Sequence, residues 1–283
     1  MEILSKTIVI TGASTGIGKS CALHLDKLGF KVYAGVRKQT DGDKLKEEAS
    51  DKFTPVILDV TDAESIEATV SIIEKETGGE VYGLVNNAGI GISGVLEVTP
   101  VTEIRKLMEV NVIGLFAVTQ AMIPLLRKGK GRIINIGSSS SLMAYPGGSV
   151  YCASKFAVRA ITDSLRLELK HFGISVVMIA PGAIESEIWE KRNVYKQELR
   201  ERVKPEIAEH YKSLAKFGDK IEQVIKKIPA GEVAKAVTKA LTSAKPKYYY
   251  YVGNDAKGAA KAAKLPKRLL DWMIMKRIQK LAR

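Results

Sequence analysis

The sequence contains few of the residues that build disulfide frameworks or metal centres. Its 283 residues include two cysteines and three histidines. Cys21 and Cys152 both fall in segments that we expect to be helical, so no disulfide framework is predicted and a reducing compartment is favoured. The histidines stand far apart in the sequence and none has a partner at metal-ligand spacing. We therefore predict no metal site.

Long apolar runs and targeting segments are also missing from the pattern. No apolar run approaches the ~18 residues that a membrane-spanning helix needs. Residues 1–6 lead directly into a β-branched run and lack the pattern of a signal peptide. These absences favour a cytoplasmic protein, with any membrane contact confined to its surface.

Positive charge is scarce in most of the chain and concentrated near its end. The formal net charge is +13. Residues 191–283 hold 24 Lys and Arg against nine Asp and Glu, whereas residues 1–190 hold 20 against 22. The excess of cations therefore belongs to the last third of the chain, and no nucleic-acid partner is predicted.

Residues 255–283 are predicted to form a basic amphipathic tail. They carry nine Lys and Arg and two Asp. Apolar residues recur at helical spacing after Pro266: Leu270, Ile274, Ile278 and Leu281. A basic helix with a Trp and an apolar stripe can lie on a membrane surface. The simpler alternative, which we favour, is that the stripe packs on the protein's own ligand entrance or on a partner subunit. We expect the tail to cap an apolar pocket and, as a second hypothesis, to rest on anionic lipid.

Strand and helix patterns alternate between residues 7 and 252. Short apolar or β-branched runs are separated by amphipathic segments, and the runs lie at residues 7–10, 31–36, 55–60, 81–85, 132–136, 174–180 and 247–252. This alternation predicts a doubly wound α/β fold, with a parallel sheet and helices on both faces. Because no internal linker appears, residues 1–254 are predicted to form one domain that includes a charged insert at residues 183–230.

A glycine-rich turn follows the first predicted strand. Gly12, Gly16 and Gly18 lie between that strand and an amphipathic helix. Glycines let backbone N–H groups approach a phosphate, and the helix N-terminus adds partial positive charge. The turn is therefore the expected place for a dinucleotide pyrophosphate. Its spacing, Gly-x-x-x-Gly-x-Gly, differs from the commoner Gly-x-Gly-x-x-Gly, and a purely structural turn is the alternative.

The ends of the next strands favour a phosphorylated dinucleotide. An acid at the end of the second strand would bind the ribose 2′-hydroxyl of NAD, but Arg37 and Lys38 stand there. Two cations favour a 2′-phosphate, so NADP(H) is predicted over NAD(H), unless both are ordinary surface residues. Asp59, at the end of the third strand, could bind the adenine amino group. The small residues that follow Asn87 allow a ligand ring to approach closely.

The catalytic candidates surround Tyr151. Tyr151 and Lys155 stand four residues apart in a predicted helix, so they project side by side. The ammonium should lower the phenol pKa from ~10 and make the pair a general acid/base near neutral pH, although the Tyr-x-x-x-Lys spacing alone can arise by chance. Ser138 ends the fifth strand and should meet the same point. Asn111 lies mid-helix, where a buried amide needs a partner and is either structural or functional.

Together these motifs resemble the short-chain dehydrogenase/reductase family over about residues 5–252. The matching motifs are Thr11-Gly12-x-x-x-Gly16-x-Gly18, Asp59, Asn86-Asn87-Ala88-Gly89, Asn111, Ser138, Tyr151-x-x-x-Lys155 and Pro181-Gly182. Two positions depart from the family pattern. Ser186 replaces the usual Thr after Pro-Gly, and Thr15 stands where NADP enzymes often have a basic residue, so the cofactor preference depends on Arg37 and Lys38.

The resemblance implies a seven-stranded Rossmann sheet, a homodimer or homotetramer, and a mechanism. Tyr151 would exchange a proton with the substrate oxygen while the nicotinamide delivers or accepts hydride, and Ser138 would hydrogen-bond that oxygen. Lys155 would lower the Tyr151 pKa and bind the nicotinamide ribose, and Asn111 would hold a water that links Lys155 to solvent. The implied cofactor contacts are Gly12, Ser14, Thr15, Gly16, Ile17, Gly18, Arg37, Lys38, Asp59, Val60, Asn87, Ala88, Gly89, Tyr151, Lys155, Pro181, Gly182, Ile184 and Ser186.

The implied substrate pocket is largely apolar and suits a bulky hydrophobic molecule. Its predicted lining is Ser138, Leu142, Met143, Tyr145, Tyr151, Ile188 and Trp189. The VYCASKFA segment and the long insert resemble the subgroup of 17β-hydroxysteroid and retinol dehydrogenases. We therefore predict an NAD(P)-dependent oxidoreductase that interconverts a hydrophobic primary or secondary alcohol and its aldehyde or ketone.

Two other classes of function are compatible with a fold of this type. A fold relative that epimerises or dehydrates a sugar nucleotide usually carries a Gly-x-x-Gly-x-x-Gly turn, which this chain lacks. A non-catalytic nucleotide-sensing or scaffold protein would tolerate loss of the catalytic set. The presence of Asn111, Ser138, Tyr151 and Lys155 together favours the enzyme.

Overall fold

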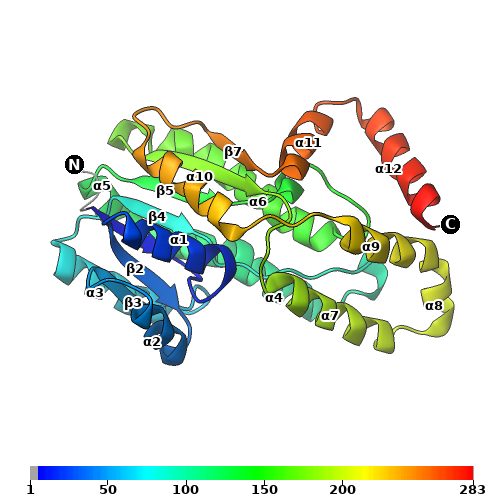
Figure 1. Cartoon of the computed structure of the whole chain (residues 1–283), viewed down its shortest axis with the longest axis horizontal. Helices are drawn as coiled ribbons and strands as arrows, with labels where there is room; N and C mark the ends of the chain where they lie inside the picture. The colour runs from blue at the N-terminus through cyan, green and yellow to red at the C-terminus, as the bar shows by residue number, and fades with distance from the viewer. Residues whose placement is uncertain (1–5, 283) are drawn as a thin grey trace.

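Seven parallel strands form one continuous sheet. The computed structural model describes residues 6–282, and the side chains of residues 6–280. The strands are β1 Thr7–Ile10, β2 Lys31–Val36, β3 Phe53–Ile57, β4 Gly83–Asn86, β5 Arg132–Ile136, β6 Ser175–Pro181 and β7 Tyr249–Val252. They lie in the order β3-β2-β1-β4-β5-β6-β7, each parallel to its neighbours. The predicted doubly wound α/β fold is confirmed (Figure 1).

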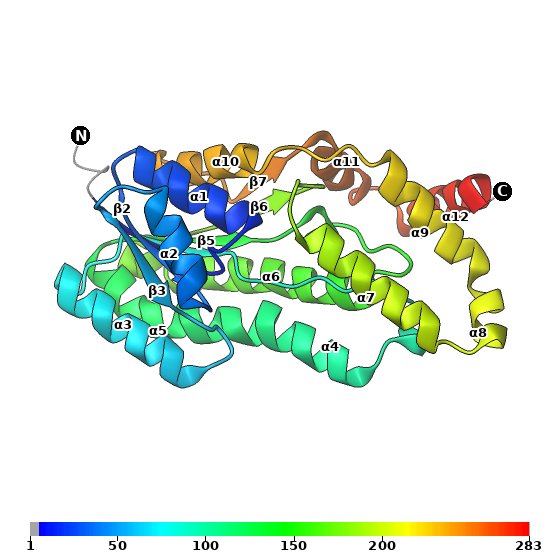
Figure 2. The same cartoon turned by 60° about the horizontal axis from the view of Figure 1, so that its bottom comes forward.

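Helices cover both faces of the sheet, as Figure 2 shows. One face carries α1 Gly16–Lys27, α2 Gln39–Glu47 and α10 Ala230–Thr242. The other face carries α3 Ala63–Thr77, α4 Val101–Met108, α5 Gly114–Lys128 and α6 Ser149–Glu168. Short 3-10 turns lie at η1 Leu96–Val98, η3 Ser139–Ser141 and η4 Lys170–Phe172.

The two cores follow from the alternation of side chains along each strand. Ile8 and Ile10 pack in the cluster beneath α1 and α10, whereas Val9, between them, packs beneath α3 and α5. All three are fully buried. A strand with both faces covered reads as a continuous apolar run, which is the pattern of residues 7–10.

The sheet changes winding direction between β1 and β4. The chain builds β1, β2 and β3 toward one edge, and then returns to add β4 on the other side of β1. Ligands of open α/β sheets bind beyond the carboxyl ends of the strands at such a switch point. The glycine turn after β1 and the Asn86–Gly89 segment after β4 therefore meet where a dinucleotide is expected.

The helix from α4 to α5 corrects one expectation. Val101–Lys128 is long and apolar enough to cross a membrane by length and composition, contrary to the prediction that no such segment exists. The prediction failed because it considered only unbroken apolar runs, whereas polar residues such as Asn111 and Gln120 interrupt this one. Half of its most apolar window is buried in the fold, where it packs on the sheet, α3 and α6.

Some strands begin or end a few residues from their expected positions. β3 ends at Ile57 rather than at residue 60, although the Leu58 N–H still donates to the Val36 carbonyl (2.8 Å). The Asp59 carboxylate then accepts from the Thr61 N–H (2.9 Å) and turns the chain away from the sheet. Residues 1–5, which carry the expectation about a signal peptide, lie outside the described part of the chain.

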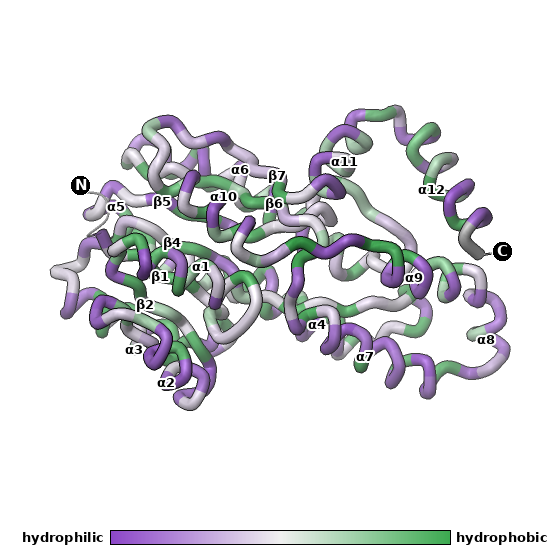
Figure 3. Tube along the Cα trace, in the orientation of Figure 1, coloured by the Kyte–Doolittle hydropathy of each residue, from purple (hydrophilic) through white to green (hydrophobic). Residues whose placement is uncertain are grey.

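The insert and the C-terminal tail form a second group of helices at one end of the molecule. They are α7 Ile188–Arg202, α8 Pro205–His210, α9 Lys212–Val224, α11 Asn254–Ala262 and α12 Lys267–Ala282. Figure 3 shows more hydrophilic colour along these helices than along the strands. α12 packs against α9, and Leu270 and Ile278 are buried while Ile274 is half-buried. The predicted helical stripe is thus present, except that the Leu281 side chain lies outside the described ones.

Candidate active site

The glycine turn after β1 packs directly on the segment after β4. Gly12 has φ +64°, and a Cβ there would lie 2.8 Å from the Cα of Ala88. A Cβ at Gly18 would lie 2.1 Å from the Gly12 carbonyl oxygen. Larger residues cannot occupy these positions without moving backbone. The structure therefore brings together two of the motifs that the sequence assigned to the cofactor.

Thr11 and Asn87 tie the two strand ends to each other. The Thr11 hydroxyl accepts from the backbone N–H groups of Asn87 (3.0 Å) and Ala88 (2.9 Å). The Asn87 side-chain amide donates in return to the carbonyls of Thr11 (3.0 Å) and Gly12 (2.9 Å). This reciprocal set fixes the floor on which a dinucleotide would rest.

The residues present fit a dinucleotide phosphate group. Thr15 caps α1 without a side-chain hydrogen bond, and no acid stands in the first turn of α1. The N–H groups at this helix start therefore remain available to an anion. Arg37 and Lys38 follow β2 as exposed side chains, and neither forms an ion pair within the described residues. Asp59 also lies at a strand end, where its carboxylate is engaged by Thr61.

The segment after β6 closes over the glycine turn. A Cβ at Gly16 would lie 3.1 Å from the Cβ of Ser186, so the two predicted cofactor motifs meet. Asp255, at the start of α11, accepts from the Ala183 N–H (2.6 Å). A Cβ at Gly182 would lie 1.8 Å from the Asp255 carboxylate. Asp255 therefore holds the Pro181–Ser186 segment in place, and Gly182 is required because it leaves room for this carboxylate.

Tyr151 and Ser138 converge at the carboxyl end of β5. Ser138 follows β5 and caps η3, and its hydroxyl accepts from the Ser140 N–H (3.1 Å). The Ser138 side chain is also hydrogen-bonded to the Tyr151 phenol, which lies in the first turn of α6. Two of the three polar groups that the sequence placed around one point are thus in contact.

Lys155 and Asn111 are the other two polar residues of the predicted catalytic set. The Lys155 ammonium is buried and donates to the Ile136 carbonyl (3.1 Å). The Asn111 amide is held by the backbone of Ile90, accepting from its N–H (2.8 Å) and donating to its carbonyl (2.9 Å). A Cβ at Gly89 would lie 3.3 Å from Asn111 Oδ1 and 3.7 Å from Lys155 Nζ. Gly89 therefore lets the β4 segment, Asn111 and Lys155 meet.

Asn111 lies in a π-helical turn, which the sequence did not reveal. Residues Glu109–Ile113 form this turn between α4 and α5, and the Gly114 N–H bonds the Glu109 carbonyl. Such turns add a residue to a helix and are frequent at functional sites. The predicted mid-helix position is confirmed, but the bulge that reorients Asn111 depends on its contacts with Ile90, 21 residues away.

The electrostatics of the site differ from the expectation in one respect. Burial raises the pKa of the Tyr151 phenol, and the neighbouring Tyr145 adds to the rise, while the hydrogen bond with Ser138 opposes it. The net direction is opposite to the lowering by Lys155 that the sequence predicted. Lys155 Nζ lies 5.8 Å from the centre of the Tyr151 ring, and burial lowers the Lys155 pKa to about 8. Desolvation by burial is the largest cause of both pKa shifts, and the spacing of residues in a sequence does not show how deeply they are buried.

The predicted substrate-pocket residues do not all gather at Tyr151. A Cβ at Gly91 would contact both Ile188 (3.4 Å) and Tyr151 (3.8 Å), so Ile188 lies near the phenol. Tyr145 is close enough to Tyr151 to shift its pKa. Trp189 donates from Nε1 to the Ile184 carbonyl (2.7 Å). The remaining two predicted residues differ in burial: Met143 is half-buried, whereas Leu142 is buried in a core cluster with Met178, Ala180 and Ala259.

A comparison with known families shows to which family the chain belongs. Residues 6–197 match the model of the family described as short chain dehydrogenase. The chain belongs to the short-chain dehydrogenase/reductase family. It is therefore an oxidoreductase of the class that uses NAD or NADP, and the predicted resemblance is confirmed.

Individual relatives show which members of this family the chain resembles. The dehydrogenase is 34% identical to human dehydrogenase/reductase SDR family member 9, over 99% of this chain and 91% of the relative. It is 34% identical to mouse retinol dehydrogenase 7 (90% and 83%) and 35% identical to bovine 17-beta-hydroxysteroid dehydrogenase type 6 (96% and 89%).

Solved structures support the same assignment. A short-chain dehydrogenase from Streptomyces avermitilis superimposes with a TM-score of 0.79 at 28% identity, covering 96% of this chain and 97% of the other. A short-chain dehydrogenase from Burkholderia cenocepacia, solved in complex with NADP, gives a TM-score of 0.75 at 28% identity, covering 97% and 99%. Both likenesses cover nearly the whole dehydrogenase, including part of its insert and tail.

The dehydrogenase site contains residues that the sequence reasoning missed. Asp255 lies in the predicted tail, yet it accepts a hydrogen bond from the Ala183 N–H, 72 positions earlier in the Pro181–Ser186 segment. Arg192 lies in the predicted charged insert, yet its charge partly opposes the rise in the pKa of both Tyr145 and Tyr151. The sequence signal for Asp255 is Gly182, because a residue without a side chain leaves room for a neighbouring group.

Proposed function

We propose that this dehydrogenase interconverts a hydrophobic primary or secondary alcohol and its aldehyde or ketone, with a preference for NADP(H). The observation that carries the proposal is the grouping of Ser138, Tyr151, Lys155 and Asn111 at the carboxyl ends of β4 and β5, beside the glycine turn. A non-catalytic nucleotide sensor would have no need for this buried polar set, whose burial costs stability.

Tyr151 is the proposed general acid and base. The bound nicotinamide supplies or takes up the hydride. In reduction the Tyr151 phenol gives its proton to the substrate oxygen, and the raised pKa keeps the phenol protonated until that oxygen becomes strongly basic. In oxidation Tyr151 accepts the alcohol proton. Ser138, already bonded to the phenol, is placed to hydrogen-bond the same substrate oxygen.

Lys155 and Asn111 are proposed to assist Tyr151 by binding the cofactor ribose and by relaying protons. Lys155 would bind the nicotinamide ribose, and its pKa of about 8 places it near the point of exchanging a proton at neutral pH. Asn111, held by both backbone groups of Ile90, would position a water between Lys155 and solvent. This arrangement gives the Tyr151 proton a route that does not pass through the substrate.

The preference for NADP(H) rests on the cations after β2. Arg37 and Lys38 are exposed, and no acid occupies the strand end where a carboxylate would favour NAD. Arg37 can form a charge-assisted pair with a 2′-phosphate. The remaining proposed cofactor contacts are Gly12, Ser14, Thr15, Gly16, Ile17, Gly18, Asp59, Val60, Asn87, Ala88, Gly89, Pro181, Gly182, Ile184 and Ser186.

The substrate class follows from the walls around Tyr151 and from the relatives. Tyr151 packs with an apolar cluster of Ile92, Leu107 and Val150. Relatives named retinol dehydrogenase and 17-beta-hydroxysteroid dehydrogenase act on hydrophobic alcohols, by their names. An apolar wall with a few polar groups is the common form of a site for such molecules.

We also infer a homodimer or homotetramer. Large apolar side chains are exposed on α4–α5 and α6, including Ile113, Phe116, Phe156 and Leu167. These helices lie together on one face, and paired helices of a second copy would cover them. Light scattering of the purified chain at low micromolar concentration would give a monomer mass if this inference is wrong.

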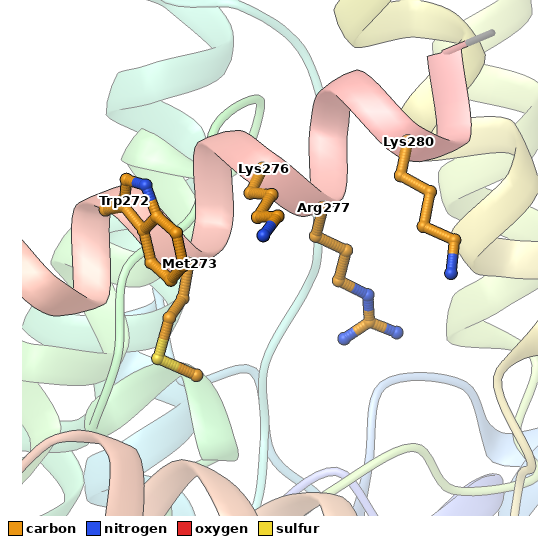
Figure 4. Close-up of a pocket in the computed structure, with 5 residues that line it drawn as sticks. All are labelled: Trp272, Met273, Lys276, Arg277 and Lys280. Atoms are coloured by element: carbon orange, nitrogen blue, oxygen red, sulfur yellow. The ribbon is translucent and has the colours of Figure 1, made fainter.

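The basic tail is proposed to cap the substrate entrance at the surface of a cytoplasmic protein and to touch anionic lipid. α12 is apolar on two sides, because Leu270 and Ile278 are buried while Trp272 and Met273 are exposed. Figure 4 shows Met273, Arg277 and Lys280 extending from one side of α12, where they line a shallow hollow. A face that combines Trp, Met and cations suits the boundary of an anionic bilayer.

A cofactor and substrate screen tests the main proposal. The wild-type chain should oxidise NADPH faster than NADH in the presence of hydrophobic ketones or aldehydes, and should reduce NADP with the corresponding alcohols. Binding of NADPH, followed by fluorescence, serves as the control for a folded site. Tight NADPH binding without turnover of any probe would favour the non-catalytic alternative.

A further inference from the structure

Two glycines leave room for the carboxylate of Asp255. Asp255 lies in the first turn of α11, shortly after β7. A Cβ at Gly253 would lie 2.6 Å from Asp255 Oδ1, and a Cβ at Gly182 would overlap the carboxylate itself. Gly182 does not have the positive φ that favours glycine. The space taken by Asp255, rather than the backbone conformation, therefore excludes a side chain at Gly182.

The Asp255 carboxylate joins two parts of the chain that are far apart in the sequence. Its Oδ1 accepts from the Ala256 N–H at the start of α11 (2.9 Å), and its Oδ2 accepts from the Ala183 N–H (2.6 Å). An acid in the first turn of a helix is favoured by the helix dipole, and the first of these bonds needs no further explanation. The second bond is partly buried, although Asp255 as a residue is exposed, and it ties α11 to the segment after β6.

The segment after β6 is held by three of its backbone N–H groups. Besides the bond from Ala183, the Gly182 N–H donates to the Val252 carbonyl of β7 (2.9 Å), and the Glu185 N–H donates to the Ile228 carbonyl (3.0 Å). The bond from Ala183 is the one of the three whose acceptor is a side chain, and a charged one. Bonds to charged acceptors are stronger than bonds between neutral groups. Asp255 is therefore the contact of this segment that a single substitution can remove.

This segment leads from the glycine turn to the catalytic phenol. Ser186 meets Gly16, where the pyrophosphate is expected, and Ile188 lies near Tyr151. The N–H of Ile184, which lies between two of the tied residues, has no hydrogen-bond partner in the described part of the chain. Because hydride must pass to or from a carbon whose oxygen contacts Tyr151, the nicotinamide half of the cofactor has to lie along this segment.

We propose that Asp255 is a positioning residue for the nicotinamide half of the cofactor. By fixing Ala183, its carboxylate sets the positions of the Ile184 N–H and the Ser186 hydroxyl and acts on the cofactor only through them. The inference rests on the proposed function, since it requires bound NADP(H). It assigns the start of the basic tail to the cofactor site, whereas α12 remains available for the roles proposed above.

The first experiment compares a whole cofactor with its adenine half. Adenosine 2′,5′-bisphosphate carries the adenine, the ribose and the 2′-phosphate but no nicotinamide. In calorimetric titrations of the full-length chain, Asp255→Ala should weaken NADPH binding by about tenfold and change binding of the bisphosphate by less than about twofold, as expected for loss of one hydrogen bond to a charged group. Asp255→Asn should stay within about threefold of wild type, because its amide oxygen can still accept from Ala183.

A matched control removes a comparable acid from another helix. Glu232 is an exposed acid in the first turn of α10 and pairs with Lys235 (2.6 Å). Glu232→Ala should therefore leave the binding of both ligands unchanged. Thermal melting reports whether each variant is folded. With NADPH that carries deuterium at the transferred position, Asp255→Ala should also show a lower kcat and a larger isotope effect than wild type, because a misplaced nicotinamide slows the hydride step.

A second variant tests the same contact from the opposite partner. Gly182→Ala should weaken NADPH binding in the wild-type chain, because the added Cβ displaces the Asp255 carboxylate. In the Asp255→Ala chain the same substitution should have little effect, since the space is then free. Strong non-additivity of this kind identifies two residues that act through one contact. This pair also decides the inference if Asp255→Ala alone lowers the melting temperature too far for titration.

Several results would overturn the inference. They are unchanged NADPH binding in Asp255→Ala, equal weakening of NADPH and the bisphosphate, additive effects of Gly182→Ala and Asp255→Ala, and an Asp255→Asn variant as weak as Asp255→Ala. The proposed function fails separately, if the wild-type chain binds NADPH but turns over no hydrophobic alcohol or ketone. If the wild-type chain binds NADH in place of NADPH, the proposed cofactor preference is wrong, and the same comparison of NADH with ADP decides the role of Asp255.

Discussion

The strand ends and the insert hold their functional residues by different forces. At the strand ends, Lys155 and Asn111 are buried and bond backbone groups of Ile136 and Ile90. In the insert, α7 and α9 are joined by ion pairs, and Leu199 is the one buried residue of α7, whereas α9 has none. Backbone contacts inside a packed core define a position closely, whereas partly exposed ion pairs contribute little and tolerate change.

The ion pairs between α7 and α9 form a short ladder. Arg192 and Lys196 pair with Glu222 at 2.6 and 3.1 Å, and Lys196 and Arg200 pair with Asp219 at 2.5 and 2.9 Å. The side chains of Arg192, Lys196 and Glu222 are 16–20% exposed, while Arg200 and Asp219 are 40–46% exposed. The ladder is therefore best shielded from solvent next to Arg192. The comparison teaches that the catalytic groups are fixed by contacts inside the core, whereas the insert is held by contacts that tolerate change.

Removing the catalytic proton should give the largest effect of all. Tyr151→Phe should lower kcat by ~10²–10⁴-fold, because only the transferable proton is removed and general acid–base catalysis is worth about that much. NADPH affinity and thermal stability should change little. Steady-state kinetics of reduction, with NADPH binding followed by fluorescence, measures both. A kcat within a few-fold of wild type would mean that another residue supplies the proton, and that the core does not carry the chemistry.

The buried charge of Lys155 should lower the stability of the folded protein at neutral pH. Burial lowers its folded-state pKa from an ordinary 10.5 to about 8. The charged form is therefore disfavoured on folding below pH 8, and stability is regained as pH rises from about 8 to 10.5, where the unfolded chain holds more protons. At about 1.4 kcal/mol per pKa unit, the cost is about 3 kcal/mol, and the hydrogen bond to Ile136 returns about 1 kcal/mol.

Lys155→Met tests this account. The variant should be inactive, yet more stable to urea than wild type at pH 7 by about 2 kcal/mol, which is the difference of the two contributions above. The advantage should shrink and vanish as pH approaches 10.5. A variant that is less stable than wild type at pH 7, or an advantage that does not change with pH, would contradict the buried-charge explanation.

Arg37 should affect the binding of NADPH but not that of NADH. Arg37→Ala should weaken NADPH binding by about tenfold or more, since it removes a charge-assisted contact with the 2′-phosphate, and should leave NADH nearly unchanged. Titration of both cofactors by fluorescence gives the two dissociation constants. Lys44→Ala, which removes an exposed cation from α2, is the matched control and should affect neither. Equal losses for NADPH and NADH would show that Arg37 does not recognise the phosphate.

Local patterns in the sequence predicted most of the core. The strand–helix alternation indicated the parallel sheet, and Gly12, Gly16 and Gly18 marked the turn at its switch point. The spacing of Tyr151 and Lys155 placed them on one helix, where the structure has them. These features are encoded within a few residues, because each depends on a strand end, a helix start or a single turn.

Contacts between distant residues escaped prediction. The bond from Ala183 to Asp255 spans 72 residues, and the contact of Arg192 with Glu222 spans 30. No period or motif connects such pairs, since each depends on how the insert and tail fold back onto the sheet. The direction of the Tyr151 pKa was missed for a related reason, because burial is a property of the assembled fold.

The smallest expected effect concerns the helix farthest from the catalytic core. A chain that ends at Ala263 lacks α12 but keeps Asp255 and its hydrogen bond with Ala183. A chain that ends at Val252 would lose this hydrogen bond as well as α12. Since α12 packs on α9, which carries Glu222, its loss should loosen the insert near Arg192. KM for hydrophobic substrates should rise a few-fold, while kcat and NADPH affinity stay constant.

The same truncated chain also tests contact with lipid. The full-length chain should sediment with vesicles rich in phosphatidylserine at low salt and be released as salt increases, because cations such as Lys276 and Lys280 contribute about 1 kcal/mol each near an anionic surface. The truncated chain should remain in the supernatant. Unchanged KM after truncation would refute the capping role, whereas the absence of salt-sensitive sedimentation of the full-length chain would refute the lipid contact alone. The two results are independent, since the capping role concerns the buried side of α12, with Leu270 and Ile278, whereas Trp272 and Met273 are exposed.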